Sequence, residues 1–152
     1  MELDSLDHRI LAQLQRDAGL SNVALADRVG LSPSACLRRV ERLKKHGVIR
    51  RIVAVVDPAR VAHGLSAIVT VEFARHGSVH RQDFLARVRA EAAVTQCYMV
   101  TGDVSCVLIV HMRDMDDYLA LAERLFERDD NVQAFYTHIV MQTIKHEPGI
   151  RL

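Results

Sequence analysis

The chain is poor in cysteine and has none of the cysteine spacings that bind a metal or build a disulfide framework. Cys36, Cys97 and Cys106 include no CxxC pair, and their number is odd. Each lies in an apolar run, so we expect three reduced cysteines in the core of a cytoplasmic protein. The histidines are not at metal-ligand spacing either, so we expect no metal ion and no bound cofactor.

Long apolar runs are absent as well. No run approaches the roughly 18 residues of a membrane span, and the acidic start MELDSLDHRI lacks the apolar segment of a signal peptide, so we expect neither. There is no nucleophile–base motif and no glycine-rich phosphate loop, which argues against an enzyme. The 152 residues, 49% apolar and 26% charged, therefore suit one or two small folded domains.

The small net charge of +1 hides an uneven distribution. Residues 1–60 hold 11 Lys and Arg against 7 Asp and Glu, whereas residues 61–152 hold 9 against 12. A basic front part and an acidic back part indicate two domains with different partners. We place the domain boundary between residues 60 and 61.

The basic charge concentrates in a helix expected over residues 32–46. Ser32-Pro33 is a helix start, and Gly47 can end the helix in the left-handed conformation. An apolar stripe at the helical period is formed by Leu37, Val40 and Leu43, with Cys36 beside it. The other faces are almost wholly cationic, which is typical of a helix that enters a DNA groove.

Two shorter helices are expected before the basic one. The first begins near Asp4 or Ser5, and its inner face is formed by Leu6, Ile10, Leu11 and Leu14. The second is capped by Ser21 and ends at Gly30, and its inner face is formed by Leu25, Ala26 and Val29. Two helices joined by a turn of a few residues, the second of them basic, make a helix-turn-helix.

After Gly47 the pattern changes to that of extended chain. Residues 48–56 are rich in β-branched side chains and end at Asp57-Pro58, so they could form a wing that brings Arg50 and Arg51 to DNA phosphates. Residues 57–64 are the expected hinge between the two domains.

The remainder alternates strands and helices. We expect strands over 65–74, 94–101, 105–112 and 132–144, and helices over 82–92 and 115–128. The run Val107-Leu108-Ile109-Val110 is expected to be buried on both faces. The helix over 115–128 has six side chains available for burial, namely Tyr118, Leu119, Leu121, Ala122, Leu125 and Phe126. The order β-α-β-β-α-β predicts an α+β, ferredoxin-like domain with helices on one face of its sheet, and a partner subunit should cover the other face.

With these elements in place, the chain resembles the Lrp/AsnC family, the leucine-responsive or feast/famine regulators. The resemblance covers almost the full length. It is carried by Leu6-Asp7, Ile10-Leu11, Leu25-Ala26, Val29-Gly30-Leu31-Ser32-Pro33-Ser34, Arg39-Val40, Leu43, Gly47, Ile49, Asp57-Pro58, Val100-Thr101-Gly102-Asp103 and Lys145. It implies an N-terminal winged helix-turn-helix (1–60) and a ferredoxin-like effector and assembly domain called RAM (61–152).

The resemblance also implies a function. It implies a transcriptional regulator that binds double-stranded DNA in a sequence-specific way and dimerises through the sheets of its second domain. Such dimers often assemble into octamers, and a small molecule, commonly an amino acid, binds between dimers.

The DNA contacts are assigned from the position of each residue on the basic helix. Ser34, Ala35 and Arg38 are expected nearest the base edges, because the first residues of a recognition helix usually are. Phosphate contacts are assigned to Arg39, Arg42, Lys45, Arg50 and Arg51, with short hydrogen bonds from Ser32 or Ser34. The competing interpretation for each arginine is plain solvation or an ion pair with Glu41.

The resemblance places the effector pocket at the loop after the second strand of the RAM domain. Its expected members are Met99, Val100, Thr101, Gly102, Asp103 and Ser105. In many members of the family an Asp stands at the position of Ser105 and an aromatic residue at that of Cys106, so this chain departs at both. An Asp would pair with an amino-acid ammonium, whereas Ser can make only a neutral hydrogen bond.

Several alternatives remain at this point. Residues 101–103 could form a tight turn alone or a turn that also lines the pocket. Thr137 and His138 could mark another wall of that pocket or an edge exposed to water. Cys36 could be a redox switch or, as we expect, a packed side chain. For the whole protein, the alternatives are an enzyme resembling the sirohaem decarboxylases and a metabolite-binding assembly module without DNA binding.

Overall fold

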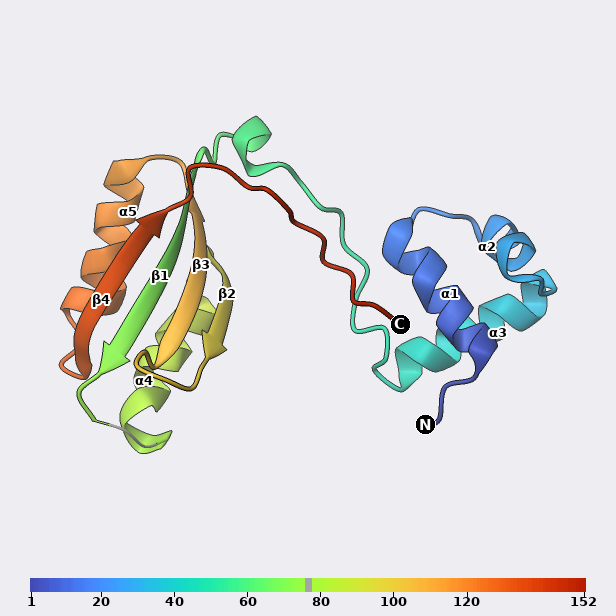
Figure 1. Ribbon diagram of the computed structural model, residues 1–152, viewed down its shortest axis with the longest axis horizontal. Coiled ribbons are helices and arrows are strands. Elements are labelled where there is room, and N and C mark those ends of the chain that lie inside the picture. The colour runs from blue at the N-terminus through green and yellow to red at the C-terminus, as the bar shows by residue number, and fades with distance from the viewer. Residues whose placement is uncertain (76–77) are drawn as a thin grey trace. The chain divides into compact units, whose positions relative to one another are not determined.

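The computed structural model describes residues 1–75 and 78–152, and the side chains of residues 78–80 are outside the description (Figure 1). The contacts divide the chain into two compact units. Unit 1 comprises Met1–Val55 together with Ile144–Leu152, and unit 2 comprises Val56–Thr143. The predicted domains, 1–60 and 61–152, differ from these units chiefly in the C-terminal tail, whose contacts lie with the first unit.

Unit 1 contains three helices, α1 (Ser5–Arg16), α2 (Asn22–Val29) and α3 (Pro33–Lys45). Each begins where the sequence predicts, because a capping side chain precedes it: Asp4, Ser21 and Ser32 accept hydrogen bonds from backbone amides of the first turn. Gly30 and Gly47 follow α2 and α3 with φ of 71° and 72°, a conformation that glycine adopts without strain.

The predicted core of unit 1 is confirmed except at Leu37 and at Leu6, which is half-buried and does not belong to the core cluster. The buried apolar side chains are those of Ile10, Leu11, Leu25, Ala26, Val29, Cys36 and Leu43. The prediction that Leu37 belongs to the inner stripe is wrong, because its residue is 47% exposed. The buried line of α3 passes through Cys36, Val40 and Leu43, and Leu37 lies about 100° around the helix from Cys36.

The chain after α3 forms no strand. Residues 50–57 lie in no helix or strand, and four of their apolar side chains, Ile52, Val53, Val55 and Val56, are exposed. A wing needs a second strand beside the first, and in the part of the chain that the structure describes the one sheet uses only strands of unit 2. A short 3₁₀ helix (Pro58–Val61) follows, capped by Asp57.

Unit 2 has the predicted β-α-β-β-α-β order. Its elements are β1 (Leu65–Phe73), α4 (Ser78–Ala90), β2 (Val94–Met99), β3 (Cys106–Met112), α5 (Met115–Ala122), a π-helical turn (Glu123–Glu127) and β4 (Val132–Ile139). The strands form one antiparallel sheet in the order β2-β3-β1-β4. β4 ends earlier than predicted because Ile139 already pairs with Ala67, close to the start of its neighbour β1.

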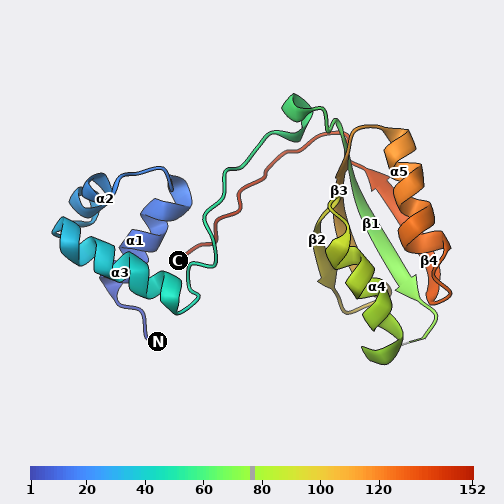
Figure 2. The same cartoon turned by 180° about the vertical axis from the view of Figure 1, so that it is seen from behind.

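Both helices of unit 2 cover the same face of the sheet (Figures 1 and 2). On this face Ala67, Val69, Val71 and Phe73 of β1 are buried, and Phe73 packs edge-on against Phe84 of α4 at 5.1 Å between ring centroids. Burial of β3 on both faces is wrong: Leu108 and Val110 are buried, but Val107 and Ile109 are only half-buried because strand residues alternate between faces. Leu119 of α5 is also exposed rather than buried.

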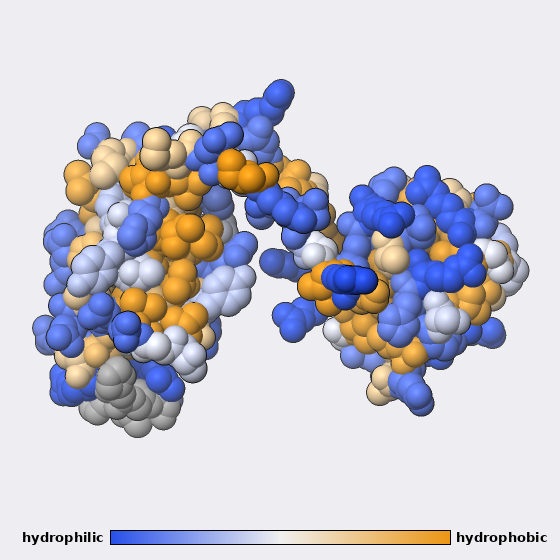
Figure 3. All heavy atoms as spheres, viewed as in Figure 1, coloured by the Kyte–Doolittle hydropathy of each residue, from blue (hydrophilic) through white to orange (hydrophobic). Residues whose placement is uncertain are grey.

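The opposite face of the sheet carries no helix. Two rows of side chains cross it: Tyr98, Val107, Thr70 and Tyr136 in one row, and Gln96, Ile109, Ile68 and His138 in the other. Tyr98 and Tyr136 are both 53% exposed, and Figure 3 shows apolar side chains along this face. We call it the open sheet face.

In the described ranges, no helix has the length and apolar character needed to cross a membrane.

Candidate nucleic-acid interface and effector loop

The N-terminal end of α3 presents small polar side chains and one arginine. Ser32 Oγ accepts from the amide of Ala35 at 3.3 Å and lies 3.3 Å from Ser34 Oγ, so the Ser32 hydroxyl is engaged as the helix cap. Ser34 and Arg38 are exposed, whereas Ala35 is half-buried. Ser34 and Arg38 are therefore the predicted base-edge residues most open to a groove.

The turn between α2 and α3 is fixed by two contacts. Asn22 Nδ2 donates to the carbonyl oxygen of Pro33 at 2.7 Å, which ties the start of α2 to the start of α3. The amide of Leu31 donates to the carbonyl of Ala26 at 2.9 Å and closes the end of α2. These contacts give α3 a defined orientation on the helix pair.

The second half of α3 is held to α1 by a cluster of ions. Arg39 Nη1 donates to Asp4 Oδ2 at 2.7 Å and to Asp7 Oδ1 at 2.8 Å, and Arg42 Nη2 donates to Asp7 Oδ2 at 2.6 Å. Asp7 is fully buried. A buried carboxylate needs such partners, since leaving it unpaired would cost several kcal/mol. Pairing of Arg39 or Arg42 with Glu41, the expected competing role, is replaced by pairing with Asp4 and Asp7.

The ion cluster also perturbs its members. The backbone amide of Asp7 and then the guanidinium of Arg39 hold the pKa of Asp4 below its usual value. The same carboxylates raise the pKa of Arg39. Asp7 is the functional residue that the sequence analysis missed, although its spacing to Ile10 and Leu11 places it on the inner face of α1.

The remaining predicted phosphate contacts are on the surface. Lys45, Arg50 and Arg51 are exposed and make no ion pair within the described ranges, like Arg38 at the other end of the helix. Leu37 is the large apolar side chain exposed on α3. The surface of α3 therefore combines free cations with one apolar side chain, a combination suited to phosphates and to base edges.

The predicted effector loop is a turn between β2 and β3. Gly102 has φ of 109°, and the amide of Val100 donates to the carbonyl of Ser105 at 3.2 Å across the loop. Met99, Val100, Thr101, Gly102 and Asp103 are exposed. The loop thus presents an open carboxylate at Asp103.

Ser105 has a structural role in this loop. Its hydroxyl accepts from the amide of Phe73 at 3.1 Å, and its own amide donates to the carbonyl of Val71 at 2.8 Å. Both bonds fasten the end of the loop to β1. The Ser105 hydroxyl, at the position where the family resemblance leads one to expect Asp, therefore already has a partner.

Thr137 and His138 do not form one wall. They are consecutive in β4, so their side chains lie on opposite faces of the sheet. The Thr137 hydroxyl is hydrogen-bonded to the Tyr118 hydroxyl of α5, whereas His138 is exposed on the open sheet face. β4 and β2 are at opposite edges of the sheet, so one chain does not bring this pair to residues 99–105.

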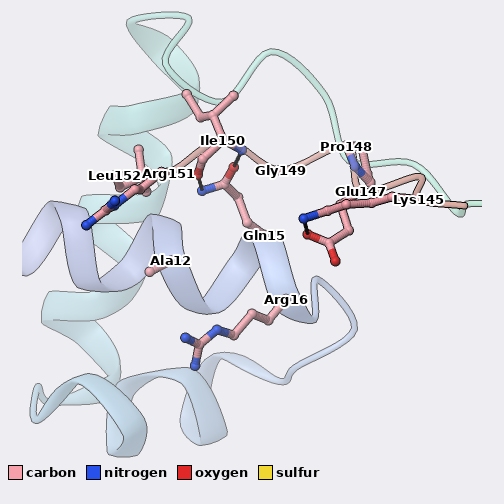
Figure 4. A pocket seen from close by; sticks show the side chains of 10 residues that line it. All are labelled: Ala12, Gln15, Arg16, Lys145, Glu147, Pro148, Gly149, Ile150, Arg151 and Leu152. Carbon is pink, nitrogen blue, oxygen red and sulfur yellow. Dashed lines mark hydrogen bonds and ion pairs between the residues drawn. The ribbon is translucent and has the colours of Figure 1, made fainter.

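A cavity lies elsewhere, between α1 and the C-terminal tail. It has a volume of about 790 Å³ and is lined by Ala12, Gln15, Arg16, Lys145 and residues 147–152 (Figure 4). Gln15 makes two hydrogen bonds with the backbone of Ile150, accepting at 2.6 Å and donating at 3.1 Å. The sequence analysis did not find this contact, because the tail has no periodic pattern. Among the described residues, no group of three or more His, Cys, Asp or Glu could hold a metal ion.

Comparison with known proteins agrees with both halves of this description. Residues 3–50 match the family model of a winged helix-turn-helix DNA-binding domain, and residues 66–150 match that of the Lrp/AsnC ligand binding domain. The chain is 35% identical to the leucine-responsive regulatory protein of Haemophilus influenzae over 143 residues, which are 94% of this chain and 86% of that protein.

Solved structures show the same likeness. The transcriptional regulator NMB0573 of Neisseria meningitidis, in complex with L-Met, superposes with a TM-score of 0.91 at 34% identity and covers 99% of this chain and 97% of its own. AsnC of E. coli superposes with a TM-score of 0.82 at 26% identity, covering 100% and 98%. The chain belongs to the Lrp/AsnC family of helix-turn-helix transcriptional regulators.

Proposed function

We propose that this regulator binds a specific double-stranded DNA site through α3 as a homodimer, and that an amino acid or related small metabolite modulates its binding or assembly. The observation that carries the proposal is the surface of α3, which is anchored by buried Asp7. Exposed Ser34 and Arg38 lie at one end of this helix, and at the other end lies Lys45, which is exposed and has no ion pair among the described residues.

The proposed contacts to DNA depend on which hydrogen-bonding groups of each side chain are not already used within the protein. Arg38 can donate two hydrogen bonds to a guanine edge, the commonest specific contact in the major groove. Lys45, Arg50 and Arg51 suit phosphates, as does the hydroxyl of Ser34. Arg39 and Arg42 act first through Asp4 and Asp7, by holding α3 in place, and any phosphate contact they make adds to that role.

Leu37 adds an apolar contact to this set. The thymine 5-methyl group is the apolar feature of the major groove, and a Leu side chain 47% exposed on α3 can cover it. We therefore propose that the site contains thymine beside the guanine that Arg38 contacts.

The dimer is proposed to form through the open sheet face. On this face a single chain leaves the side chains of Ile68, Tyr98 and Tyr136 exposed to water, with Val107 and Ile109 half-buried between them. Packing a second copy against them removes that apolar area from water, and a two-fold axis, the commonest symmetry of soluble oligomers, would place the same face on both copies. Further assembly of dimers, up to an octamer, extends the same proposal.

The effector is proposed to bind at residues 99–105 and in a pocket completed by another subunit. The relative NMB0573 was solved as a complex with L-Met. Here Asp103 offers an exposed carboxylate to an ammonium group, while Ser105 stays bound to β1. Thr137 and His138 would contribute only from a neighbouring subunit. No catalytic role is proposed, and because a DNA-binding regulator acts where the DNA is, the protein is placed in the cytoplasm.

The test is a titration of the purified protein against DNA from upstream of its own gene and against a scrambled duplex, at several salt concentrations. The Arg38→Ala variant should lose the preference between the duplexes by roughly 5- to 150-fold, equivalent to the 1–3 kcal/mol of a guanine contact. Arg75→Ala, an exposed arginine of unit 2, is the matched control and should bind like the parent. If neither duplex binds even at low salt, the proposed function is refuted.

A further inference from the structure

Two cysteines of unit 2 are neighbours in the sheet. Cys97 of β2 pairs with Leu108 of β3, and Met99 of β2 pairs with Cys106 of β3. Cys97 and Cys106 are thus diagonal neighbours whose side chains lie on one face of the sheet, the face covered by the helices. Cys106 is fully buried there, whereas Cys97 is half-buried because β2 is an edge strand.

A small cavity makes the Cys97 thiol accessible. The cavity has a volume of about 250 Å³ and lies between the end of α4 and the start of β2. Its lining is formed by Val88, Arg89, Val94, Thr95, Gln96 and Cys97. The cavity therefore brings a small molecule next to Cys97 and Arg89, whereas Cys106 is fully buried and does not line it.

The neighbours of Cys97 favour its thiolate. The neighbouring Cys106 thiol, with a contribution from the charge of Arg89, lowers the pKa of Cys97 to about 7, and the neighbouring Cys97 thiol together with burial raises the pKa of Cys106. These are the titratable and charged groups found to act on Cys97 in the described chain, one on β3 and one on α4. In unit 1, burial raises the pKa of Cys36.

We propose that Cys97 is a modification site of this protein, at which small hydroperoxides and soft electrophiles react with the thiolate in the cavity between α4 and β2. The inference is independent of the proposed effector and DNA contacts. The proposal places redox chemistry at Cys97, whereas Cys36, for which a redox switch was the alternative to the expected packing, is buried in the core of unit 1.

The Cys97 thiolate attacks the terminal oxygen of a hydroperoxide, ROOH; an S–O bond forms, the O–O bond breaks, and the alkoxide leaves and takes a proton to become ROH. Cys97 is oxidised by two electrons to a sulfenic acid, and the hydroperoxide is reduced. Diagonal strand neighbours are roughly 7–8 Å apart, whereas disulfide Cα atoms are usually about 4.4–6.8 Å apart, so the sulfenic acid rather than a Cys97–Cys106 disulfide is the expected product.

The experiment measures the reactivity of each cysteine in the folded, full-length protein. Brief alkylation with iodoacetamide at a series of pH values, followed by peptide mass spectrometry, should label Cys97 at least tenfold faster than Cys36 or Cys106. The labelling rate of Cys97 should rise with a midpoint near pH 7. Hydrogen peroxide followed by dimedone should tag Cys97 as the sulfenic acid.

Variants test whether the Cys106 thiol is the cause of the lowered pKa of Cys97. Cys106→Ala removes the neighbouring thiol and should move the midpoint of Cys97 labelling upward. Cys106→Ser keeps a group that can donate a hydrogen bond, so it should preserve much of the effect, and it keeps the test valid if the alanine variant unfolds. Cys36→Ala is the matched control and should leave the Cys97 profile unchanged. Equal labelling of the three cysteines, or a Cys97 midpoint at the ordinary thiol value of about 8.5, would overturn the proposal. None of these readouts needs DNA, so they separate this proposal from the proposed function.

Discussion

Replacing Asp7 with Asn tests whether the ion cluster anchors α3. Asp7 is fully buried and accepts from Arg39 at 2.8 Å, from Arg42 at 2.6 Å and from the Asp4 amide at 3.2 Å. Asn keeps the shape but has one acceptor oxygen and no charge. In this variant Arg39 keeps its ion pair with Asp4, whereas Arg42 loses the carboxylate that it binds. The Nε of Arg42 is already buried without a hydrogen-bond partner in the described structure.

The expected change in the free energy of unfolding follows from these contacts. Breaking a buried ion pair by removing one partner costs about 3–5 kcal/mol. The side chains of Arg39 and Arg42 are 24% and 42% exposed, so water will solvate them in part. We therefore expect Asp7→Asn to lower the free energy of unfolding of unit 1 by about 2–3 kcal/mol. For a unit of this size that corresponds to roughly 10–20 °C in Tm.

The assay is hydrogen exchange followed by mass spectrometry on the full-length protein, with urea to bring unit 1 into its unfolding range. Peptides from α1 and α3 should lose protection in Asp7→Asn, while peptides from β1 and β3 should not change. Asp27→Asn, on the exposed surface of α2, is the matched control. If Asp7→Asn lowers the stability of α1 and α3 by no more than this control, the ion cluster does not anchor α3 and the reasoning fails.

Three further predictions concern single side chains. Leu37→Ala should weaken operator binding about fourfold, and replacing the contacted thymine with deoxyuridine should add nothing more, because both changes delete the same apolar contact; additive losses in the double-mutant cycle would contradict this. Acid should destabilise unit 1 through Asp4: its folded-state pKa lies below the unfolded value of 3.8, so the stabilisation is present above that pH and is lost as pH falls through the folded pKa. Asp4→Asn should remove this part of the acid dependence in urea titrations from pH 5 to pH 2, and an unchanged profile would exclude the assignment. Gln15→Ala should increase amide exchange at Ile150 about tenfold by deleting its acceptor, with Gln13→Ala as the control, and unchanged exchange would show that the bond does not form.

The helices and strands could be predicted because their signals are local. The starts of α1, α2 and α3 each depend on one capping side chain a residue away, and the strands of unit 2 on alternation within a few positions. Alternation also predicts that Thr137 and His138 point to opposite faces, so that part of the site could have been excluded from the sequence. Leu37 was misplaced because i and i+3 spacing alone allows two neighbouring stripes on a helix.

The ion cluster could not be predicted in the same way. The bonds of Asp7 reach residues more than 30 positions away in the sequence, and which arginine meets which carboxylate depends on how α1 packs on α3. The two hydrogen bonds of Ser105 likewise depend on the register of β3 against β1. The residue types at Asp7 and Ser105 indicate that each makes polar contacts. Only the packing shows that these contacts are made within the chain rather than with a ligand.

The contact between Gln15 and Ile150 joins residues 135 positions apart. Closing so long a loop costs more chain entropy than any contact among α1, α2 and α3, so the tail is expected to dock late in folding. During synthesis the three helices leave the ribosome long before residues 144–152 exist. The DNA-binding unit is therefore completed by a segment that is synthesised after the whole of unit 2, and an affinity tag joined after Leu152 would be attached to that unit rather than to the sheet domain that precedes it in the chain.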